Sequence, residues 1–157
     1  MQPQKKRSRI LAVDVGLKRI GLAISDEQKI IASPLENLLA AEAIKPTIQR
    51  LLASVEKIKT EKGCEIEEIV IGLPLKMNGT ESTTTEHVRR FAAALKENTI
   101  ITVHLLDERL TSVQAERMLM DANFTRKKRA QFVDRVSAVI LLQCYLDLKK
   151  PIGQSFA

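Results

Sequence analysis

The chain has few residues suited to sulfur or imidazole chemistry. Its two cysteines, Cys64 and Cys144, lie far apart and neither belongs to a Cys-x-x-Cys motif. This spacing predicts neither a zinc site nor a disulfide framework. The two histidines, His87 and His104, are also isolated in the sequence, so we expect both to be structural. Hydrolytic chemistry in this chain would therefore use carboxylates and not an imidazole base.

Long apolar segments are also missing. A membrane-spanning helix needs about 20 consecutive apolar residues, and no run of this sequence approaches that length. The N-terminal residues MQPQKKRSR are basic and lead directly into a strand-like segment, where a signal peptide would have an apolar core. These features predict a cytoplasmic protein without a membrane partner.

Aromatic residues make up only 3% of the chain, whereas 25 Lys and Arg outnumber 19 Asp and Glu. The net charge of +6 favours a polyanionic partner such as nucleic acid. Proteins that bind unpaired bases normally stack them on aromatic rings. The composition therefore favours recognition of the backbone and shape of structured nucleic acid.

The 157 residues, 45% of them apolar, suffice for one well-buried core. We expect a basic disordered tail at 1–8, one domain at 9–150 and a C-terminal tail at 151–157. Short runs rich in Val, Ile and Leu predict strands, and apolar residues spaced three to four apart predict helices.

The expected elements follow the order βββαβαβαα. The strands are 9–16, 19–26, 29–38, 67–74 and 100–108, and the helices are 41–62, 82–97, 112–122 and 129–149. This order predicts an α/β fold with a five-stranded mixed sheet flanked by helices. Its first three strands are expected to be antiparallel, and the later ones parallel through helical crossovers. Gly63 is expected to end the first helix, and Thr83 and Glu86 have capping-box spacing at the second.

Acidic residues stand at the ends of two expected strands. Asp14 ends the first strand, and Asp107 and Glu108 end the last. Since parallel crossovers bring strand ends to one edge, these acids are expected to lie together. Asp134, on the last helix, can point toward the same edge. Clustered carboxylates repel one another unless a divalent cation compensates them, and oxygen ligands favour Mg²⁺ or Mn²⁺.

Each acid alone has a simpler interpretation. Asp14 precedes Val15-Gly16 and could form a turn. Glu108 could be a strand-end charge paired with the next residue, Arg109, and Asp134 could be a solvated helix residue. The joint placement of the three acids at one edge favours a metal site that activates water for phosphodiester hydrolysis.

Five segments of the chain resemble the YqgF family, also called RuvX, of pre-16S rRNA nucleases. They are LAVDVGLKRIGLAISD, IASPLENL, IVIGLPLKMNGTES, LLDERLTSVQAERML and VDRVSAVILLQCYLD. The resemblance implies a RuvC-type RNase H-like fold, in which Asp14, Glu108 and Asp134 are the catalytic acids and metal ligands. Asp107 is given a supporting role because alternation places it on the opposite face of its strand. Ser137 departs from the family, which usually has Ala or a similar small residue there.

Basic and polar residues near the acids are the expected substrate contacts. Lys18 and Arg19 follow the first acid, and the run 126–129 precedes the last. Either group could bind phosphates, although the second is equally typical of a solvated helix start. The expected substrate-binding residues are Lys18, Arg19, Asn78, Thr80, Arg109, Lys127 and Lys128.

The resemblance implies a hydrolase, a metal-dependent endonuclease that processes the 5′ end of pre-16S rRNA in ribosome biogenesis. Its partners would be structured RNA and ribosomal precursor particles. Two alternatives stay open: a Holliday junction resolvase acting on branched, four-way DNA, and a catalytically weak nucleic-acid-binding factor of ribosome maturation or transcription. An actin-like ATPase also opens with Asp-x-Gly, but it needs a second domain for which this chain has no room. The sequence is compatible with a monomer or a homodimer.

Overall fold

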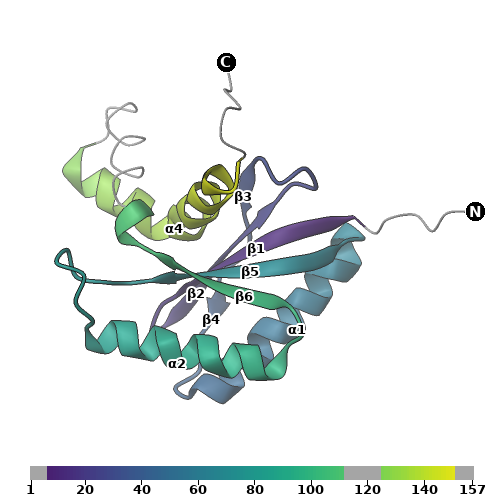
Figure 1. Ribbon diagram of the computed structural model, residues 1–157, viewed down its shortest axis with the longest axis horizontal. Coiled ribbons are helices and arrows are strands. Elements are labelled where there is room, and N and C mark those ends of the chain that lie inside the picture. Colours follow the sequence, from purple (N-terminus) through teal and green to yellow (C-terminus); the bar gives the residue numbers. More distant parts are fainter. Residues whose placement is uncertain (1–6, 112–124, 151–157) are drawn as a thin grey trace, which may run out of the picture.

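One mixed sheet organises the fold (Figure 1). In the computed structural model the described residues are 7–111 and 125–150, with only the backbone described for 126 and 128–135. The strands are β1 (Ser8–Val15), β2 (Arg19–Ser25), β3 (Ala32–Pro34), β4 (Leu38–Leu39), β5 (Glu65–Leu73) and β6 (Thr102–Asp107). The helices are α1 (Ile44–Lys62), α2 (Thr83–Asn98) and α4 (Arg126–Leu148).

The strand order is β3-β2-β1-β5-β6. β2 is antiparallel to β1 and β3, whereas β1, β5 and β6 are parallel. This arrangement confirms the α/β mixed sheet predicted from the sequence. The single strand expected at 29–38 is wrong in detail, because two short strands, β3 and β4, pair with β2 in its place. β3 ends at Pro34, Leu35 still donates its N–H to the Leu22 carbonyl at 3.0 Å, and β4 then pairs with the start of β2, so the described sheet has six strands and not five.

The two faces of the sheet carry cores of different size. On β1, Leu11 and Val13 face the larger core, which is completed by α1 and α2. Ile10 and Ala12 face a smaller core, completed by residues of α4 that include Leu142. Figure 1 shows the same arrangement, with α1 and α2 on one side of the sheet and α4 on the other. The next residue in the Ile10–Ala12 alternation is Asp14, which therefore lies on the α4 face.

The helix ends follow local chemistry. α1 ends at Gly63, whose φ of 61° is the left-handed conformation expected of a helix stop. At α2 the capping box is made by Ser82 and Thr85, and not by the Thr83–Glu86 pair that spacing suggested. The Glu86 carboxylate instead accepts a bond from Arg90, one turn further along the helix. α4 begins three residues before its expected start, and the helix expected at 112–122 lies outside the described residues.

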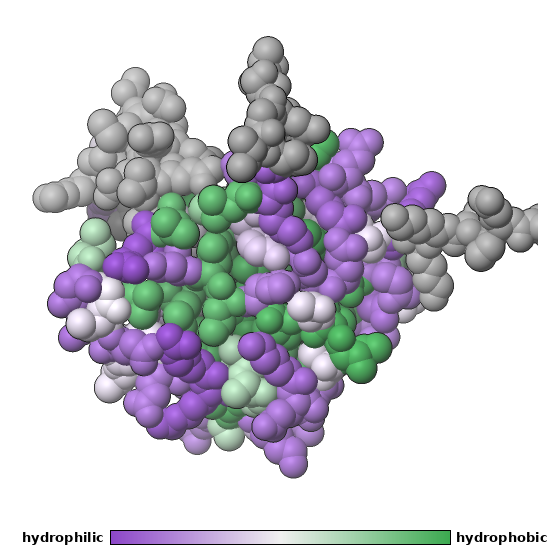
Figure 2. All heavy atoms as spheres, viewed as in Figure 1, coloured by the Kyte–Doolittle hydropathy of each residue, from purple (hydrophilic) through white to green (hydrophobic). Residues whose placement is uncertain are grey.

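Apolar side chains gather over the edge strand β6 on the face shown in Figure 2. Ile100, before this strand, is fully exposed, and Leu105 and Leu106 within it are half-buried. Among the helices of the described residues, none has the length and apolar character needed to cross a membrane.

Candidate active site

Asp14 and Glu108 lie on the same face of the sheet, with β5 between their strands. Asp14 is near the end of β1, and Glu108 directly follows β6, where its backbone N–H donates to the Leu73 carbonyl at 3.0 Å. The Glu108 side chain lies over Gly72 of β5, because a Cβ at Gly72 would be only 2.7 Å from Glu108 Oε1. The missing side chain at Gly72 therefore creates the space in which Glu108 reaches toward Asp14.

Burial and charge act together on Glu108. Burial raises the pKa of this carboxyl to about 7, and the negative charges of Asp14 and Asp107 contribute to the same shift. A carboxyl in such surroundings is strained when ionised, and a nearby divalent cation would relieve the strain. The position of Glu108 is thus unfavourable for a lone carboxylate and favourable for a cation ligand.

Asp14 contacts α4 directly. The Ser137 hydroxyl donates to Asp14 Oδ2 at 2.5 Å. Gly21 of β2 lies beside this contact, where an added Cβ would be in ordinary van der Waals contact with the Asp14 Cβ at 3.4 Å and the Ala138 Cβ at 3.6 Å. Ser137, noted in the sequence only as a departure from the family, is therefore part of the site. Helix α4 is held against the edge where the acids gather.

Asp134 lies on α4, one helical turn before Ser137 and Ala138. Residues three and four apart share one face of a helix, so position 134 lies on the face that meets the sheet. Its side chain is outside the described part of the structure. The prediction that Asp134 is the third acid therefore stays a prediction.

The described donor set fits a hard cation. It consists of the Asp14 and Glu108 carboxylates and the Ser137 hydroxyl, all oxygen atoms, which suit Mg²⁺ or Mn²⁺ better than zinc. Among the side chains that the structure describes, which exclude that of Asp134, no group of three His, Cys, Asp or Glu residues could hold a metal. A complete site would need a further ligand.

Asp107 and Arg109 form a tight pair beside this site. Both Asp107 carboxylate oxygens accept bonds from the Arg109 side chain, the shortest from Nη2 at 2.6 Å. These bonds from Arg109 hold the pKa of Asp107 below its usual range. Asp107 follows the alternation of Leu105, which packs against the larger core, so it faces away from Asp14. Arg109, an expected substrate contact, already has its guanidinium engaged.

The other expected substrate contacts whose side chains are described are all exposed. Lys18 and Arg19 follow β1, and Lys127 lies in the first turn of α4. Lys76, which the sequence did not single out, lies in the loop after β5 and carries the fourth cation near this edge. None of the four forms an ion pair with a described residue. In the same loop, Asn78 Oδ1 accepts bonds from the Thr80 N–H and hydroxyl. The side chain of Lys128 lies outside the described residues.

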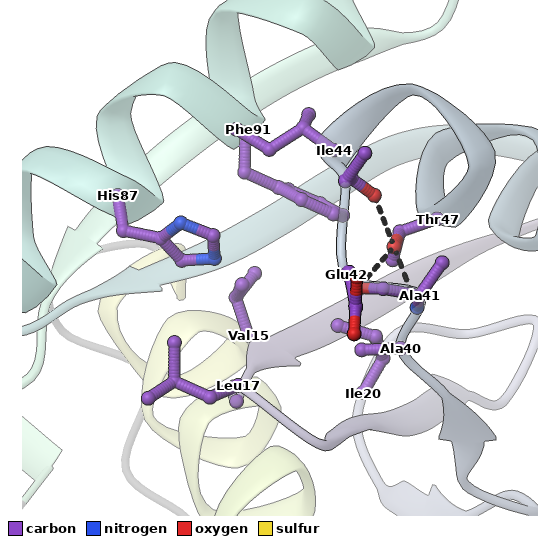
Figure 3. Close-up of a pocket in the computed structure, with 12 residues that line it drawn as sticks. Val15, Leu17, Ile20, Ala40, Ala41, Glu42, Ile44, Thr47, His87 and Phe91 are labelled. Carbon is purple, nitrogen blue, oxygen red and sulfur yellow. Dashed lines mark hydrogen bonds between the residues drawn. The ribbon is translucent and has the colours of Figure 1, made fainter.

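A cavity of about 50 Å³ lies on the opposite face of the sheet (Figure 3). Val15, Leu17, His87 and Phe91 are among its lining residues. The Thr47 hydroxyl, also at its wall, bonds to the backbone of residues 41 and 43. Ligand pockets usually measure roughly 300 Å³ or more, so this cavity is a small packing space separate from the acids.

Comparison with known proteins gives consistent results. The sequence pattern of the RuvX family, described as Holliday junction resolvase, matches residues 8–148. A proposed pre-16S rRNA nuclease of Protochlamydia amoebophila is 50% identical over 147 residues, covering 94% of this chain and 98% of the relative. One from Koribacter versatilis is 42% identical over 146 residues, covering 93% and 91%.

Solved structures show the same fold at low identity. RuvC of T. thermophilus in complex with a Holliday junction substrate has a TM-score of 0.53 at 14% identity, covering 89% of this chain and 96% of that one. A second Thermus thermophilus RuvC structure has a TM-score of 0.52 at 14% identity, covering 87% and 92%. With a match that spans nearly the whole described fold, and with relatives up to 50% identical, this chain belongs to the RuvX family.

Proposed function

We propose that this chain is a metal-dependent endonuclease that hydrolyses phosphodiester bonds in structured RNA and matures the 5′ end of pre-16S rRNA. The observation that carries the proposal is the placement of Glu108 over Gly72 on the α4 face, near enough to Asp14 for the charge of that acid to raise its pKa. The substrate is proposed from the relatives, which are 50% and 42% identical and named for pre-16S rRNA.

The proposed metal ligands are Asp14, Glu108 and Asp134, and the proposed metal is Mg²⁺ or Mn²⁺. When bound, it would supply the Lewis acid that activates water and stabilises the leaving oxygen. Glu108 contributes a carboxylate whose ionisation depends on a nearby positive charge. Asp14 is oriented by the Ser137 hydroxyl, which donates to Oδ2 of its carboxylate.

Substrate binding is assigned to the cations around the acid edge. Lys18, Arg19, Lys76 and Lys127 have no ionic partner within the described residues, so their charge is available to phosphates. Lys128 is included on its sequence position, and Asn78 and Thr80 supply polar contacts from the loop after β5. We propose that the partners are structured RNA and ribosomal precursor particles in the cytoplasm.

A second candidate is resolution of four-way DNA junctions. It is favoured by the description of the family as Holliday junction resolvase and by the shared fold with a RuvC that holds such a junction. Because a resolvase must cut two opposed strands, this function requires a symmetric dimer. A monomer in solution would therefore favour the RNA substrate.

The test is cleavage of labelled precursor RNA and of a labelled four-way junction in Mg²⁺, alongside the solution mass. We expect cleavage of the RNA. Asp14→Asn, Glu108→Gln and Asp134→Asn should each lower kcat by about 100-fold or more, since a metal ligand contributes several kcal/mol to the transition state. Affinity for the RNA should stay close to that of the parent, because phosphate contacts are retained.

Glu86→Gln provides the matched control, since this exposed acid lies on α2 away from the site. Activity near that of the parent in Asp134→Asn would remove Asp134 from the ligand set. Binding of both substrates without cleavage of either would make the chain a nucleic-acid-binding factor and would contradict the proposal.

A further inference from the structure

We propose that Asp107 and Arg109 act together as a clamp that positions Glu108, and that Arg109 is a positioning residue and not a phosphate contact. The clamp is defined as the pair of side chains of residues 107 and 109, on either side of Glu108 in the sequence. The inference rests on the proposed function, in which Glu108 is a metal ligand.

The clamp bends the chain at Glu108. Asp107 Oδ1 accepts a bond from the Arg109 backbone N–H at 2.9 Å. A carboxylate that bonds the backbone two residues on forms an Asx-turn, which fixes a bend at the residue between them. The Arg109 guanidinium then closes on the same carboxylate, through Nε at 3.0 Å and Nη2 at 2.6 Å. Because Asp107 faces the larger core, the bend directs Glu108 to the other face.

The backbone of Glu108 is fixed on both sides of this bend. Its N–H donates to the Leu73 carbonyl at 3.0 Å, which continues the β5–β6 pairing by one residue. Its carbonyl accepts bonds from the Thr111 N–H at 3.1 Å and from the Thr111 hydroxyl at 2.7 Å. Because the N–H and carbonyl of Glu108 are both bonded, the clamp sets the direction in which the Glu108 side chain extends over Gly72.

Arg109 also contacts the loop that carries Lys76. Its Nη1 lies 3.5 Å from the Met77 carbonyl. Gly79 has a φ of 84°, and a Cβ there would lie 3.3 Å from Arg109 Nη1, so the guanidinium packs against this turn. The turn is closed by a bond of 2.7 Å from the Gly79 N–H to the Lys76 carbonyl. The clamp therefore joins the strand end that carries Glu108 to the loop that carries a proposed phosphate contact.

These contacts give Arg109 a different role from its basic neighbours. Its side chain is 34% exposed, and Nε, Nη1 and Nη2 all have protein acceptors. The planar guanidinium can satisfy a carboxylate and a carbonyl at once, whereas a lysine ammonium would keep the charge without this geometry. Arg109→Lys thus separates positioning from simple charge.

The first experiment measures cleavage kinetics and nucleic-acid affinity for Asp107→Ala, Asp107→Asn, Arg109→Lys and Arg109→Ala. We expect kcat to fall about 10- to 100-fold in the Ala and Lys variants, the range typical of residues that orient metal ligands. KM, affinity and its dependence on salt should not change. Asp107→Asn should be impaired less, because it keeps an acceptor for the Arg109 N–H. The double variant Asp107→Ala/Arg109→Ala should be no worse than the more severe single variant.

The second experiment measures Mn²⁺ affinity by calorimetry, with no nucleic acid present. Affinity should fall in Asp107→Ala and Arg109→Lys, as in Glu108→Gln. Arg90→Lys is the matched control, because Arg90 pairs with an exposed acid on α2 at 2.9 Å, and it should bind Mn²⁺ like the parent. If Arg109→Ala does not fold, Arg109→Lys and Asp107→Asn give the comparison.

A raised KM and a weaker salt dependence in Arg109→Ala, with kcat unchanged, would show a phosphate contact and overturn the inference. Full activity in Arg109→Lys would do so as well, since charge alone would suffice. The proposed function fails differently, if the parent cleaves neither substrate. In that case Mn²⁺ affinity decides: weaker binding in the clamp variants supports positioning, whereas binding equal to the parent refutes it.

Discussion

Glu108 is the residue whose surroundings depart most clearly from those of a surface carboxyl. Its pKa is raised to about 7 by burial and by the charges of Asp14 and Asp107, against 4.5 for an ordinary glutamate. A raised folded-state pKa means that the folded protein binds this proton more tightly than the unfolded chain. The proton on Glu108 therefore stabilises the folded protein fully below about pH 4.5, and this stabilisation is lost as the pH rises through about 7.

Because of the raised pKa of Glu108, the stability of the metal-free protein should fall as the pH rises, which can be tested in EDTA. Between pH 5 and pH 8 the free energy of unfolding of the parent should decrease relative to Glu108→Gln by on the order of 2 kcal/mol, allowing for partial exposure of the group. Urea unfolding of both proteins at several pH values checks it. Parallel curves for the two proteins would mean that Glu108 titrates as an exposed acid, and the proposed crowding with Asp14 would be refuted.

Gly72 allows a second prediction at this scale. Alanine in its place should leave the fold intact but displace the Glu108 carboxylate, since the new Cβ would lie 2.7 Å from Oε1. We expect kcat to fall about 10- to 100-fold, as for other changes that move a metal ligand. The control is Gly63→Ala, at a φ of 61° with no atoms nearby. It should lower stability by about 1 kcal/mol and leave kcat unchanged.

The sequence predicted some of these residues and not others, for a physical reason. Asp14 and Glu108 were predictable because strand alternation and parallel crossovers place both on one face and at one edge. The hydrogen bonds between Asp107 and Arg109 could not be predicted in this way, because a turn closed by a side chain leaves no periodic pattern in the sequence. Ser137 was visible only as a departure, because its contact with Asp14 depends on how α4 packs against the sheet.

At the scale of elements, the sheet order and the helices on its two faces followed from apolar periodicity. The division of 29–38 into β3 and β4 did not, because the apolar pattern predicted one strand running through Glu36 and Asn37, which lie between the two strands and belong to neither. The capping box at α2 differed by one residue, since Ser82 has the extended backbone of a helix cap. Local side-chain bonding, and not the overall pattern, decided the position of the capping box.

The first turn of α4 carries a prediction about substrate binding. Replacing Lys127, Lys128 and Arg129 together by Ala should weaken RNA affinity and reduce the slope of log affinity against log salt by roughly 0.7 to 0.9 for each phosphate that these side chains neutralise. The matched control is the triple replacement of Lys57, Lys62 and Lys96 by Ala. It removes the same charge from the C-terminal parts of α1 and α2. Equal slopes for the two triple variants would exclude this turn from the RNA interface.

At the scale of the whole molecule, a bound metal would join the ends of two strands to α4. β1 and β6 pack on both cores, whereas α4 packs on the smaller core and has no residue in the larger one. Mg²⁺ should therefore raise the melting temperature of the parent, by the equivalent of about 2.7 kcal/mol at a hundred times its Kd. The effect should be smaller in Asp14→Asn.

Hydrogen exchange locates this stabilisation. Mg²⁺ should slow exchange in α4 more than in α1, because α1 packs on the larger core and has no candidate ligand. Equal protection of both helices would show that the ion binds elsewhere or binds without joining α4 to the sheet.

The contact between Ser137 and Asp14 spans 123 residues of the sequence. The first strand and the last described helix must therefore both be present before the site is complete. During translation, β1 and β5 leave the ribosome long before α4, and the α4 face of the sheet stays uncovered until the helix arrives. A nascent chain that has not yet released α4 from the ribosome therefore lacks the complete site and cannot use it to cut the RNA around it.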